Sequence, residues 1–467
     1  MIPKLSYYTI FSEPVNNGED FILFSTRTSK ATILSKSNGE LLLNGSVNEI
    51  APKVYNKLVE DQCLVDENED ELLTIVNENK SYVDNSDRLY EVIQPSAMCQ
   101  LGCDYCGQEH QKKYLKNDLF DKLINRIRFK AKLSDFKYLD IGWFGGEPLM
   151  ALTQIRELTP LLKSLAEELN LIYGSKIVTN GLSLKPNIFK ELATKLSVSS
   201  IEVTLDGTAE FHDRRRHTKE GVASFDLILK NLLNIFKLKN FHKYNCSISI
   251  RCNVDHRNWE GVSPLIKLLA KHKFQDYISY FYTMGVYSWG GNDAHTKSLT
   301  KEEYAGKEIE WMIEMLEHGF VPAMLPQRQK QVCMAVSKIS EMYDPYGNIF
   351  NCTEVSLTSV YEKTPYMLGN LAFSDNNLVQ NKPLNDWNDT LLTNRFPCHT
   401  CKMLPVCGGG CPKSWHEDMR SCPSSKFNIK DKLLISYLAS NGAIDIPEKS
   451  ESENELEKEN EPIVVNL

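Results

Sequence analysis

The sequence contains no long hydrophobic run and no excess of positive charge. Residues 1–5 lack the apolar core of a signal peptide, and no stretch is long enough to span a membrane. The net charge of −8 provides no basic field that would attract nucleic acid. We therefore expect a cytoplasmic chain that binds neither a membrane nor nucleic acid.

Cysteine is scarce outside two groups, although the chain holds 13 in all. In a reducing compartment, grouped cysteines are more often metal ligands than disulfide partners. The first group is Cys99, Cys103 and Cys106, with the spacing C-x3-C-x2-C. Three soft thiolates on one loop favour an iron–sulfur cluster with one iron left open. The alternatives are a zinc ion, for which His110 is the one nearby fourth ligand, and three unrelated buried thiols.

The 467 residues suggest two to four domains. From about residue 90 the chain alternates between strand patterns and helix patterns. Strands are expected at residues 90–93, 138–144, 175–179, 200–205 and 247–251, and helices at 155–169, 188–196 and 225–236, the second capped by Asn187. This alternation predicts an α/β fold of parallel strands with helical crossovers. In barrels of this type, the chemistry lies on loops at the C-terminal ends of strands.

Polar motifs follow several of these expected strands. In Gly145-Gly146-Glu147-Pro148, the glycines would leave backbone carbonyls and the Glu147 carboxylate free to accept hydrogen bonds. Further candidates at strand ends are Asn180, Thr204, Asp206, Arg216 and Arg251. Each also has an ordinary explanation: a glycine turn, an Asp-Gly or Asn-Gly turn, an ion pair between Asp206 and Arg216, or a solvent-facing Arg251.

The cysteine motif and the strand-end motifs resemble, in order and spacing, those of the radical S-adenosylmethionine (SAM) enzymes over residues 90–285. The resemblance implies a partial (β/α)6 TIM-like barrel in which Cys99, Cys103 and Cys106 bind a [4Fe-4S] cluster and its open iron holds SAM. It also implies a set of SAM contacts: Tyr105, Gly145, Gly146, Glu147, Pro148, Asn180, Thr204, Asp206, Arg216 and Arg251. Two positions depart from the family pattern. Thr204 replaces a serine, and Gly107 stands where many relatives carry an aromatic residue.

A second cysteine group, with Gly347 at its characteristic place, resembles the SPASM extension of that family over residues 286–430. The resemblance implies two auxiliary [4Fe-4S] clusters, three clusters in all. The first auxiliary cluster would be bound by Cys333, Cys352 and Cys411, and the second by Cys398, Cys401, Cys407 and Cys422. The alternative, a zinc ribbon at Cys398, Cys401, Cys407 and Cys411, would leave Cys333, Cys352 and Cys422 without a metal to bind.

Two complete thiolate-bound clusters need eight cysteines, and the second group supplies seven. The remaining cysteines, Cys63, Cys246 and Cys252, all lie far upstream. We therefore hypothesise that the first auxiliary cluster has an open position or a ligand other than cysteine, such as Gln331. A contribution from Cys246 would refute this hypothesis.

Residues 1–85 are expected to form a separate α+β domain. A hairpin around Asn16-Asn17-Gly18, a third strand at residues 31–34 and three helices follow one another, with Pro52 in the first turn of the second helix. This order resembles the winged-helix-like module that holds the leader of a precursor peptide, although a generic accessory domain fits as well. Residues 79–87 are expected to be a linker, and residues 441–467 an acidic disordered tail.

These resemblances imply an oxidoreductase that matures a ribosomally made peptide, by thioether or carbon–carbon crosslinking, with a flavodoxin or ferredoxin type of electron donor. Formylglycine formation on a sulfatase and peptide epimerisation are alternatives within the family. An iron–sulfur electron-transfer protein is the alternative outside catalysis. No residue is identified as an essential general base. The glycine-rich aromatic loop at residues 287–291 either approaches the barrel mouth or connects barrel and extension.

Overall fold

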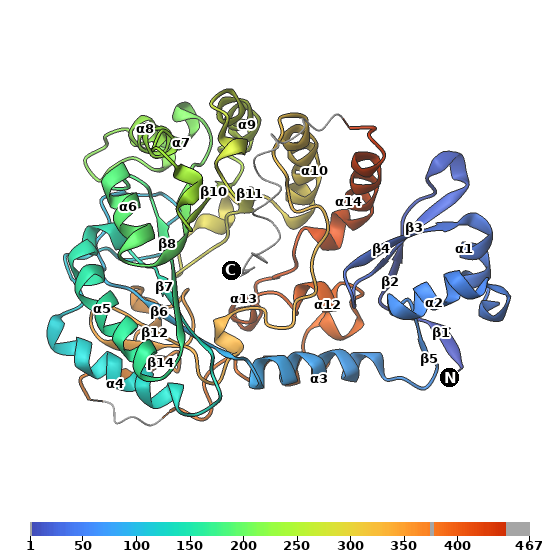
Figure 1. Ribbon diagram of the computed structural model, residues 1–467, viewed down its shortest axis with the longest axis horizontal. Helices are drawn as coiled ribbons and strands as arrows, with labels where there is room; N and C mark the ends of the chain where they lie inside the picture. The colour runs from blue at the N-terminus through green and yellow to red at the C-terminus, as the bar shows by residue number, and fades with distance from the viewer. Residues whose placement is uncertain (1, 374–377, 445–467) are drawn as a thin grey trace.

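A computed structural model describes residues 2–373 and 378–444 of the chain (Figure 1). A barrel-like α/β part lies on one side of the molecule, the N-terminal part on the other, and the cysteine-rich extension between and beneath them. No helix in the described part of the chain is long and apolar enough to cross a membrane. Most of the predicted tail, from residue 445 on, lies outside the described residues.

The barrel part is built on six parallel strands that lie side by side in chain order. They are β6 (Arg88–Ile93), β7 (Tyr138–Trp143), β8 (Ile172–Thr179), β9 (Val198–Thr204), β10 (Ser247–Val254) and β11 (Tyr280–Gly285). The helices α4 (Phe120–Ala131), α5 (Leu152–Glu168), α6 (Pro186–Thr194), α7 (Ala209–Arg215), α8 (Phe225–Phe236) and α9 (Val262–Lys271) join them. The predicted parallel strands with helical crossovers are confirmed. The expected cap at Asn187 is wrong, because the helix starts at Pro186 and Lys185 precedes it.

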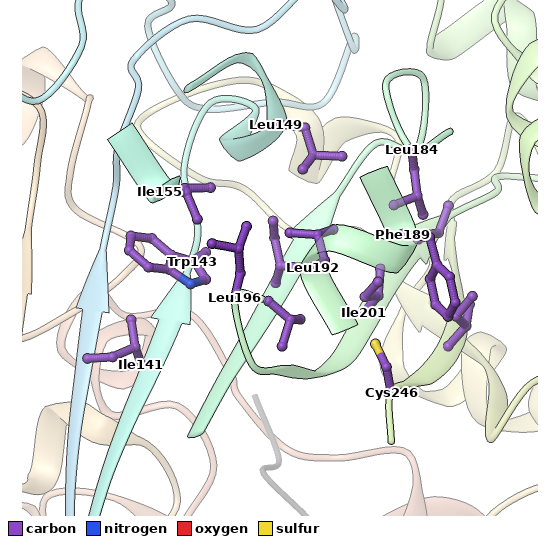
Figure 2. Close-up of a cluster of buried hydrophobic side chains, with 14 of the residues drawn as sticks. Ile141, Trp143, Leu149, Ile155, Leu184, Phe189, Leu192, Leu196, Ile201 and Cys246 are labelled. Atoms are coloured by element: carbon purple, nitrogen blue, oxygen red, sulfur yellow. The ribbon is translucent and has the colours of Figure 1, made fainter. Parts of the chain in front are cut away.

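The main core lies between these strands and the helices outside them. Alternate side chains of a strand point to opposite faces, so Ile201 and Val203 of β9 are buried in this core while Glu202 faces the inside of the barrel. Figure 2 shows part of the core, with Phe189 and Cys246 among its labelled side chains. Burial raises the pKa of Cys246 to about 12, so Cys246 is a protonated thiol in apolar surroundings.

The extension continues the barrel sheet instead of forming a separate body. Its strands are β12 (Glu341–Tyr343), β13 (Asn348–Phe350) and β14 (Met367–Asn370), and β12 pairs in parallel with β6. Its helices are α10 (Lys301–Glu317), α11 (Trp387–Thr390), α12 (Leu404–Cys407), α13 (Pro412–His416) and α14 (Ser425–Ser440). The longest two, α10 and α14, pack against each other, and α14 continues past the expected domain end at residue 430.

A buried ion network ties the extension to the barrel. The ammonium of Lys130 on α4 lies 2.6 Å from Glu91 Oε1 on β6 and 2.9 Å from Glu341 Oε2 on β12. Arg126 Nε also donates to Glu341 Oε2, at 2.7 Å. All four side chains are buried. Burial alone would raise the pKa of Glu341, but Lys130 and Arg126 outweigh burial and hold that pKa well below its usual range.

The N-terminal part contains the predicted hairpin and third strand. Its elements are β1 (Pro3–Leu5), β2 (Thr9–Phe11), β3 (Asp20–Ser25), β4 (Lys30–Ser35), α1 (Lys36–Leu43), α2 (Pro52–Glu60), β5 (Leu64–Asp66) and α3 (Glu71–Asp84). Strands β2, β3 and β4 form an antiparallel sheet, and Pro52 is the first residue of α2, as expected. The expected linker at residues 79–87 is wrong, because α3 runs to Asp84 and Asn79 is buried, where it accepts a hydrogen bond from Arg328.

This N-terminal part shares two apolar cores with the extension. Tyr8, Ile75 and Val76 pack in one cluster with Trp387 and Phe396. A second cluster joins Ile22 and Phe24 on β3 to Met403, Val406, Ile429 and Leu433. Residues 1–85 are therefore anchored on the extension by buried side chains, and removing them would expose both cores to water.

Candidate functional site

The first three cysteines lie on the loop that follows β6. Burial raises the pKa of Cys103 to about 12, with Arg216 acting to lower it and the thiols of Cys106 and Cys99 acting to raise it, so the three thiols are near neighbours. Cys106 Sγ lies 3.9 Å from His110 Nε2. Burial lowers the pKa of His110 to about 4, so this imidazole is neutral. The predicted set is thus brought together by one loop.

Glu147 connects the loops that follow two neighbouring strands. Its carboxylate is 1% exposed and accepts hydrogen bonds from Thr179 Oγ1 at 2.7 Å, from the backbone N–H of Asn180 at 2.7 Å and from that of Leu149 at 2.9 Å. Asn180 Nδ2 in turn donates to Cys99 Sγ at 3.7 Å. Glu147 therefore fixes the backbone of the loop that carries Asn180, which contacts Cys99. The contact of Glu147 with SAM stays a prediction.

The two glycines of the same motif leave no room for side chains. Gly145 has φ +79° and a Cβ there would overlap the side chain of Gln94, while Gly146 has φ +55° and a Cβ would overlap the backbone of Ser96 and Met98. The motif therefore packs directly under the start of the cysteine loop. Pro148 begins the short helical turn at Pro148–Ala151.

Tyr105, Asp206 and Arg216 form one hydrogen-bonded network. Tyr105 Oη donates to Asp206 Oδ2 at 2.5 Å and accepts from Arg216 Nη1 at 2.5 Å. Asn253, which the sequence did not single out, donates its side-chain amide to Tyr105 Oη at 3.1 Å and its backbone N–H to Asp206 Oδ1 at 2.8 Å. Arg216 Nη1 lies 3.9 Å from Asp206 Oδ2, so the ion pair considered above is present, with Tyr105 joining its members.

His212, another residue without a predicted role, supports this network from behind. Its Nδ1 accepts the backbone N–H of Asp206 at 3.1 Å, and its Nε2 faces Ser224 Oγ at 3.1 Å. Ser224 Oγ donates to the carbonyl of Arg216 at 2.5 Å. Burial lowers the pKa of His212 to about 3, so the ring is neutral with its proton on Nε2. In the sequence, His212 is marked only by its place four residues before Arg216.

Thr204 and Arg251 lie opposite each other in register on β9 and β10. Arg251 Nε donates to Asn253 Oδ1 at 2.8 Å, and its Nη1 lies 3.7 Å from Glu202 Oε1. Tyr282 Oη donates to Glu202 Oε2 at 2.6 Å. The Arg251 side chain is 22% exposed, so it faces the barrel interior with partners, and the idea of a solvent-facing arginine is wrong.

Trp289 fills the space beside Gly107. A Cβ on Gly107 would overlap both the carbonyl and the indole of Trp289. Asn292 Nδ2 donates to the carbonyl of Tyr105 at 3.0 Å, and Trp289 Nε1 donates to the carbonyl of Glu354. The segment that holds Trp289 and Asn292 therefore connects the cysteine loop to the extension. The aromatic ring next to Gly107 is supplied by Trp289 instead of by a neighbour in the sequence.

Four cysteines of the second group surround one small cavity. Cys398, Cys401, Cys407 and Cys422 all line it, together with Met403, Leu404 and Trp415. These four come from the end of the chain between α11 and α14 and are the set predicted for the second auxiliary cluster. Burial raises the pKa of Cys398 and of Cys407 to about 12.

The other three cysteines of this group are neighbours of one another. Burial raises the pKa of Cys352 well above its usual value, and the charges of Glu354, Cys411 and Cys333 act in the same direction. Gln331 Nε2 donates to the carbonyl of Cys333 at 3.3 Å.

The three cysteines outside both groups lie in other surroundings. Cys246 and Cys252 are in the barrel core, and Cys63 is in the core of the N-terminal part. None of them packs with the second group.

Zinc and iron–sulfur clusters differ in how their ligands are arranged. Within residues 2–373 and 378–444, no group of three or more His, Cys, Asp or Glu side chains is arranged to hold a single metal ion. Zinc needs its ligands about 2.0–2.3 Å from one ion. In a [4Fe-4S] cluster each thiolate binds a different iron, and thiols set around a cavity fit that group.

Comparison with known proteins gives matches over much of the chain. The cysteine-type anaerobic sulfatase-maturating enzyme of Clostridium novyi (strain NT) is 22% identical over 356 residues, which cover 69% of this chain and 87% of that protein. An uncharacterised protein of Synechocystis sp. PCC 6803, sll1766, is 28% identical over 150 residues, 30% of this chain and 36% of that protein. The chain thus matches about a third of the length of the latter.

A solved structure described as native anSMEcpe with bound AdoMet and Cp18Cys peptide shares the fold. It has a TM-score of 0.57 and 16% identity, and covers 76% of this chain and 98% of its own. The family model of the radical SAM superfamily matches residues 93–278, which include the cysteine loop and strands β7 to β10. Residues 93–278 therefore carry a radical SAM domain, as the resemblance over residues 90–285 implied.

Proposed function

We propose that this chain is a radical SAM peptide maturase that modifies a ribosomally made precursor peptide by forming a thioether or carbon–carbon crosslink. The observation that carries the proposal is the pairing of a three-thiol loop at the strand ends with a second group, in which four thiols line one cavity. The sequence pattern assigns three [4Fe-4S] clusters to these ten cysteines.

Each part of the site has a role in this proposal. When bound, the clusters and SAM would supply one-electron chemistry, in which SAM is the source of a 5′-deoxyadenosyl radical for hydrogen abstraction and the auxiliary clusters are acceptors for the electron released at bond closure. Cys99, Cys103 and Cys106 hold the first cluster. The network of Tyr105, Asp206 and Arg216 fixes the loop and presents polar groups toward SAM. An external flavodoxin or ferredoxin would supply the electron.

A peptide substrate is supported by the relatives and by the N-terminal part. The solved relative holds a peptide, and the Clostridium novyi relative is named as a sulfatase-maturating enzyme. That name favours a second candidate function, oxidation of a cysteine to formylglycine on a sulfatase. The sheet of β2, β3 and β4, followed by helices, favours the precursor peptide, because its outer strand offers an edge for an extended leader.

The first test is SAM cleavage by the reconstituted, reduced protein under anaerobic conditions. We expect 5′-deoxyadenosine to form, and its absence from fully loaded protein would overturn the proposal. A search of the adjacent genes for a short precursor, followed by co-expression and mass spectrometry, identifies the product. Loss of two hydrogens per modified site indicates a crosslink. An unchanged mass indicates epimerisation, and modification of a sulfatase peptide alone favours the second candidate.

The first auxiliary cluster is proposed to keep a position without cysteine. Cys246 and Cys252 lie in the barrel core and Cys63 in the N-terminal core, which leaves Cys333, Cys352 and Cys411 as its thiol ligands. Mössbauer spectroscopy of the iron-loaded protein should show one iron site distinct from the others in this cluster. Eight equivalent thiolate-bound sites in the two auxiliary clusters would contradict this assignment.

We expect the leader to pair along β4, one of the two outer strands of the N-terminal sheet. Ile33 is 56% exposed there and would bury its side chain under a bound peptide. Ile33→Glu should weaken binding of the labelled precursor by roughly tenfold, the cost of about 1.5 kcal/mol for one lost apolar contact. Fluorescence anisotropy measures this. Leu43→Glu, 60% exposed on α1, is the matched control, and equal losses in both variants would argue against the β4 edge.

A further inference from the structure

One charged side chain lines the cavity of the four cysteines. The other residues around Cys398, Cys401, Cys407 and Cys422 are apolar or uncharged: Pro397, Met403, Leu404, Gly409, Trp415, Ser421 and Pro423. Lys426 is the exception. It stands four residues after Cys422, at the start of α14.

Lys426 makes a contact that differs from those of the other lysines on its helix. Its ammonium donates to Cys422 Sγ at 3.8 Å. Lys430 and Lys432 instead pair with carboxylates, at 2.6 Å with Glu13 and at 3.0 Å with Glu308. In the part of the chain that the structure describes, Lys426 forms no such ion pair. Its charge is therefore directed at the sulfur rather than neutralised by an acid.

Two further cations surround the same sulfur. Cys422 raises the pKa of Arg420, chiefly through a side-chain hydrogen bond. Burial lowers the pKa of Lys301 while Cys422 and Cys411 act to raise it, so Lys301 lies near both thiols. Arg420 also lies 3.3 Å from Glu302, which offsets part of its charge. Lys426 remains the cation with direct access to the cavity.

We propose that Lys426 is a redox-tuning residue, whose ammonium holds the reduction potential of the second auxiliary cluster above the value that four thiolates alone would set. Each thiolate brings a negative charge, and reduction adds one more inside an apolar pocket. A cation hydrogen-bonded to a ligand sulfur stabilises the reduced form more than the oxidised form, since potentials follow net charge and hydrogen bonds to sulfur. The inference rests on the proposed function, which places a cluster at these cysteines.

A raised reduction potential would set the direction of electron flow in the proposed reaction. An electron released when the new bond closes would move toward the acceptor of higher potential, and Lys426 makes the second auxiliary cluster that acceptor. The reduced cluster then passes its electron to an external one-electron carrier of the flavodoxin or ferredoxin type. The loss of two hydrogens is thereby balanced: the radical takes one hydrogen atom, the cluster takes one electron, and the remaining proton leaves to solvent.

The test measures potentials in a background in which Cys99, Cys103 and Cys106 are alanine, so that only the auxiliary clusters contribute. We expect Lys426→Met to lower one of the two midpoint potentials by at least about 59 mV, a tenfold change in the one-electron equilibrium. Potentiometric titration followed by electron paramagnetic resonance measures the shift. Lys426→Arg keeps the positive charge, so its midpoint potential should differ from that of the chain with Lys426 by much less than this shift.

Lys430→Met is the matched control on the same helix, because its lysine is paired with Glu13 and faces away from the cavity. If Lys426→Met loses its iron, Lys426→Gln keeps a donor without the charge and takes its place. Equal potentials in the loaded Lys426 and Lys430 variants would overturn the inference while leaving the cluster itself intact. Iron and sulfide analysis that finds no second auxiliary cluster in the unsubstituted chain would overturn the proposed function instead.

Discussion

Cys103→Ala should abolish formation of 5′-deoxyadenosine and lower the iron content by about four atoms per chain. Cys103 shares one loop with Cys99 and Cys106, and its thiol is surrounded by their charges and that of Arg216. With two thiolates left, the loop no longer holds a cluster that binds SAM. Iron analysis and chromatography of the SAM products measure both effects on anaerobically reconstituted protein.

Cys63→Ala is the control for this experiment. Cys63 is a buried cysteine that lies in the N-terminal core, away from both cysteine groups. It should keep the full iron content and the full rate of SAM cleavage. Wild-type product formation by Cys103→Ala, or the same iron loss in Cys63→Ala, would show that the loop is not the SAM-binding centre.

Lys130→Met should lower the free energy of unfolding by about 3–5 kcal/mol, because it leaves a buried carboxylate without its partner. Lys130 is the cation paired with Glu91, at 2.6 Å, and both side chains are fully buried. Arg126 still pairs with the carboxylate of Glu341 in this variant. The carboxylate that loses its partner is therefore that of Glu91. Urea denaturation followed by tryptophan fluorescence measures the change, and a midpoint equal to wild type would contradict it.

Two further variants identify the cause of this loss. Lys132→Met, at the exposed end of the same helix, should change stability by no more than about 0.5 kcal/mol. Glu91→Leu added to Lys130→Met should recover part of the stability, since no unpaired charge then remains in the core. If the double variant is less stable than Lys130→Met, packing rather than charge explains the effect.

The local part of the site could be predicted from the sequence because short spacing constrains it. Cys99, Cys103 and Cys106 share a loop, and Glu147 and Asn180 follow neighbouring parallel strands, so their proximity followed from the strand order. Asn253 and His212 could not be predicted in the same way. Their contacts depend on which side chain faces Tyr105 or the backbone of Asp206, a matter of packing across three loops.

Long-range features were missed for a different reason. Strand β12 has three residues and no alternating pattern, so nothing in residues 341–343 marked it as a partner of β6. The linker expected at residues 79–87 was wrong because polar residues such as Asn79 can be buried when Arg328 satisfies them. The contact of Lys426 with Cys422 required the start of α14, which the sequence pattern did not locate.

The pairing of β12 with β6 also sets an order of events during synthesis. Glu91 and its neighbour across the sheet, Glu341, are separated by about 250 residues of chain. At about 5–20 residues per second, the open edge of β6 would wait roughly 10–50 s for β12 to leave the ribosome. The radical SAM domain therefore reaches its final form late in translation. Until β12 is added, one edge of the barrel sheet has unpaired backbone groups that another strand could bind.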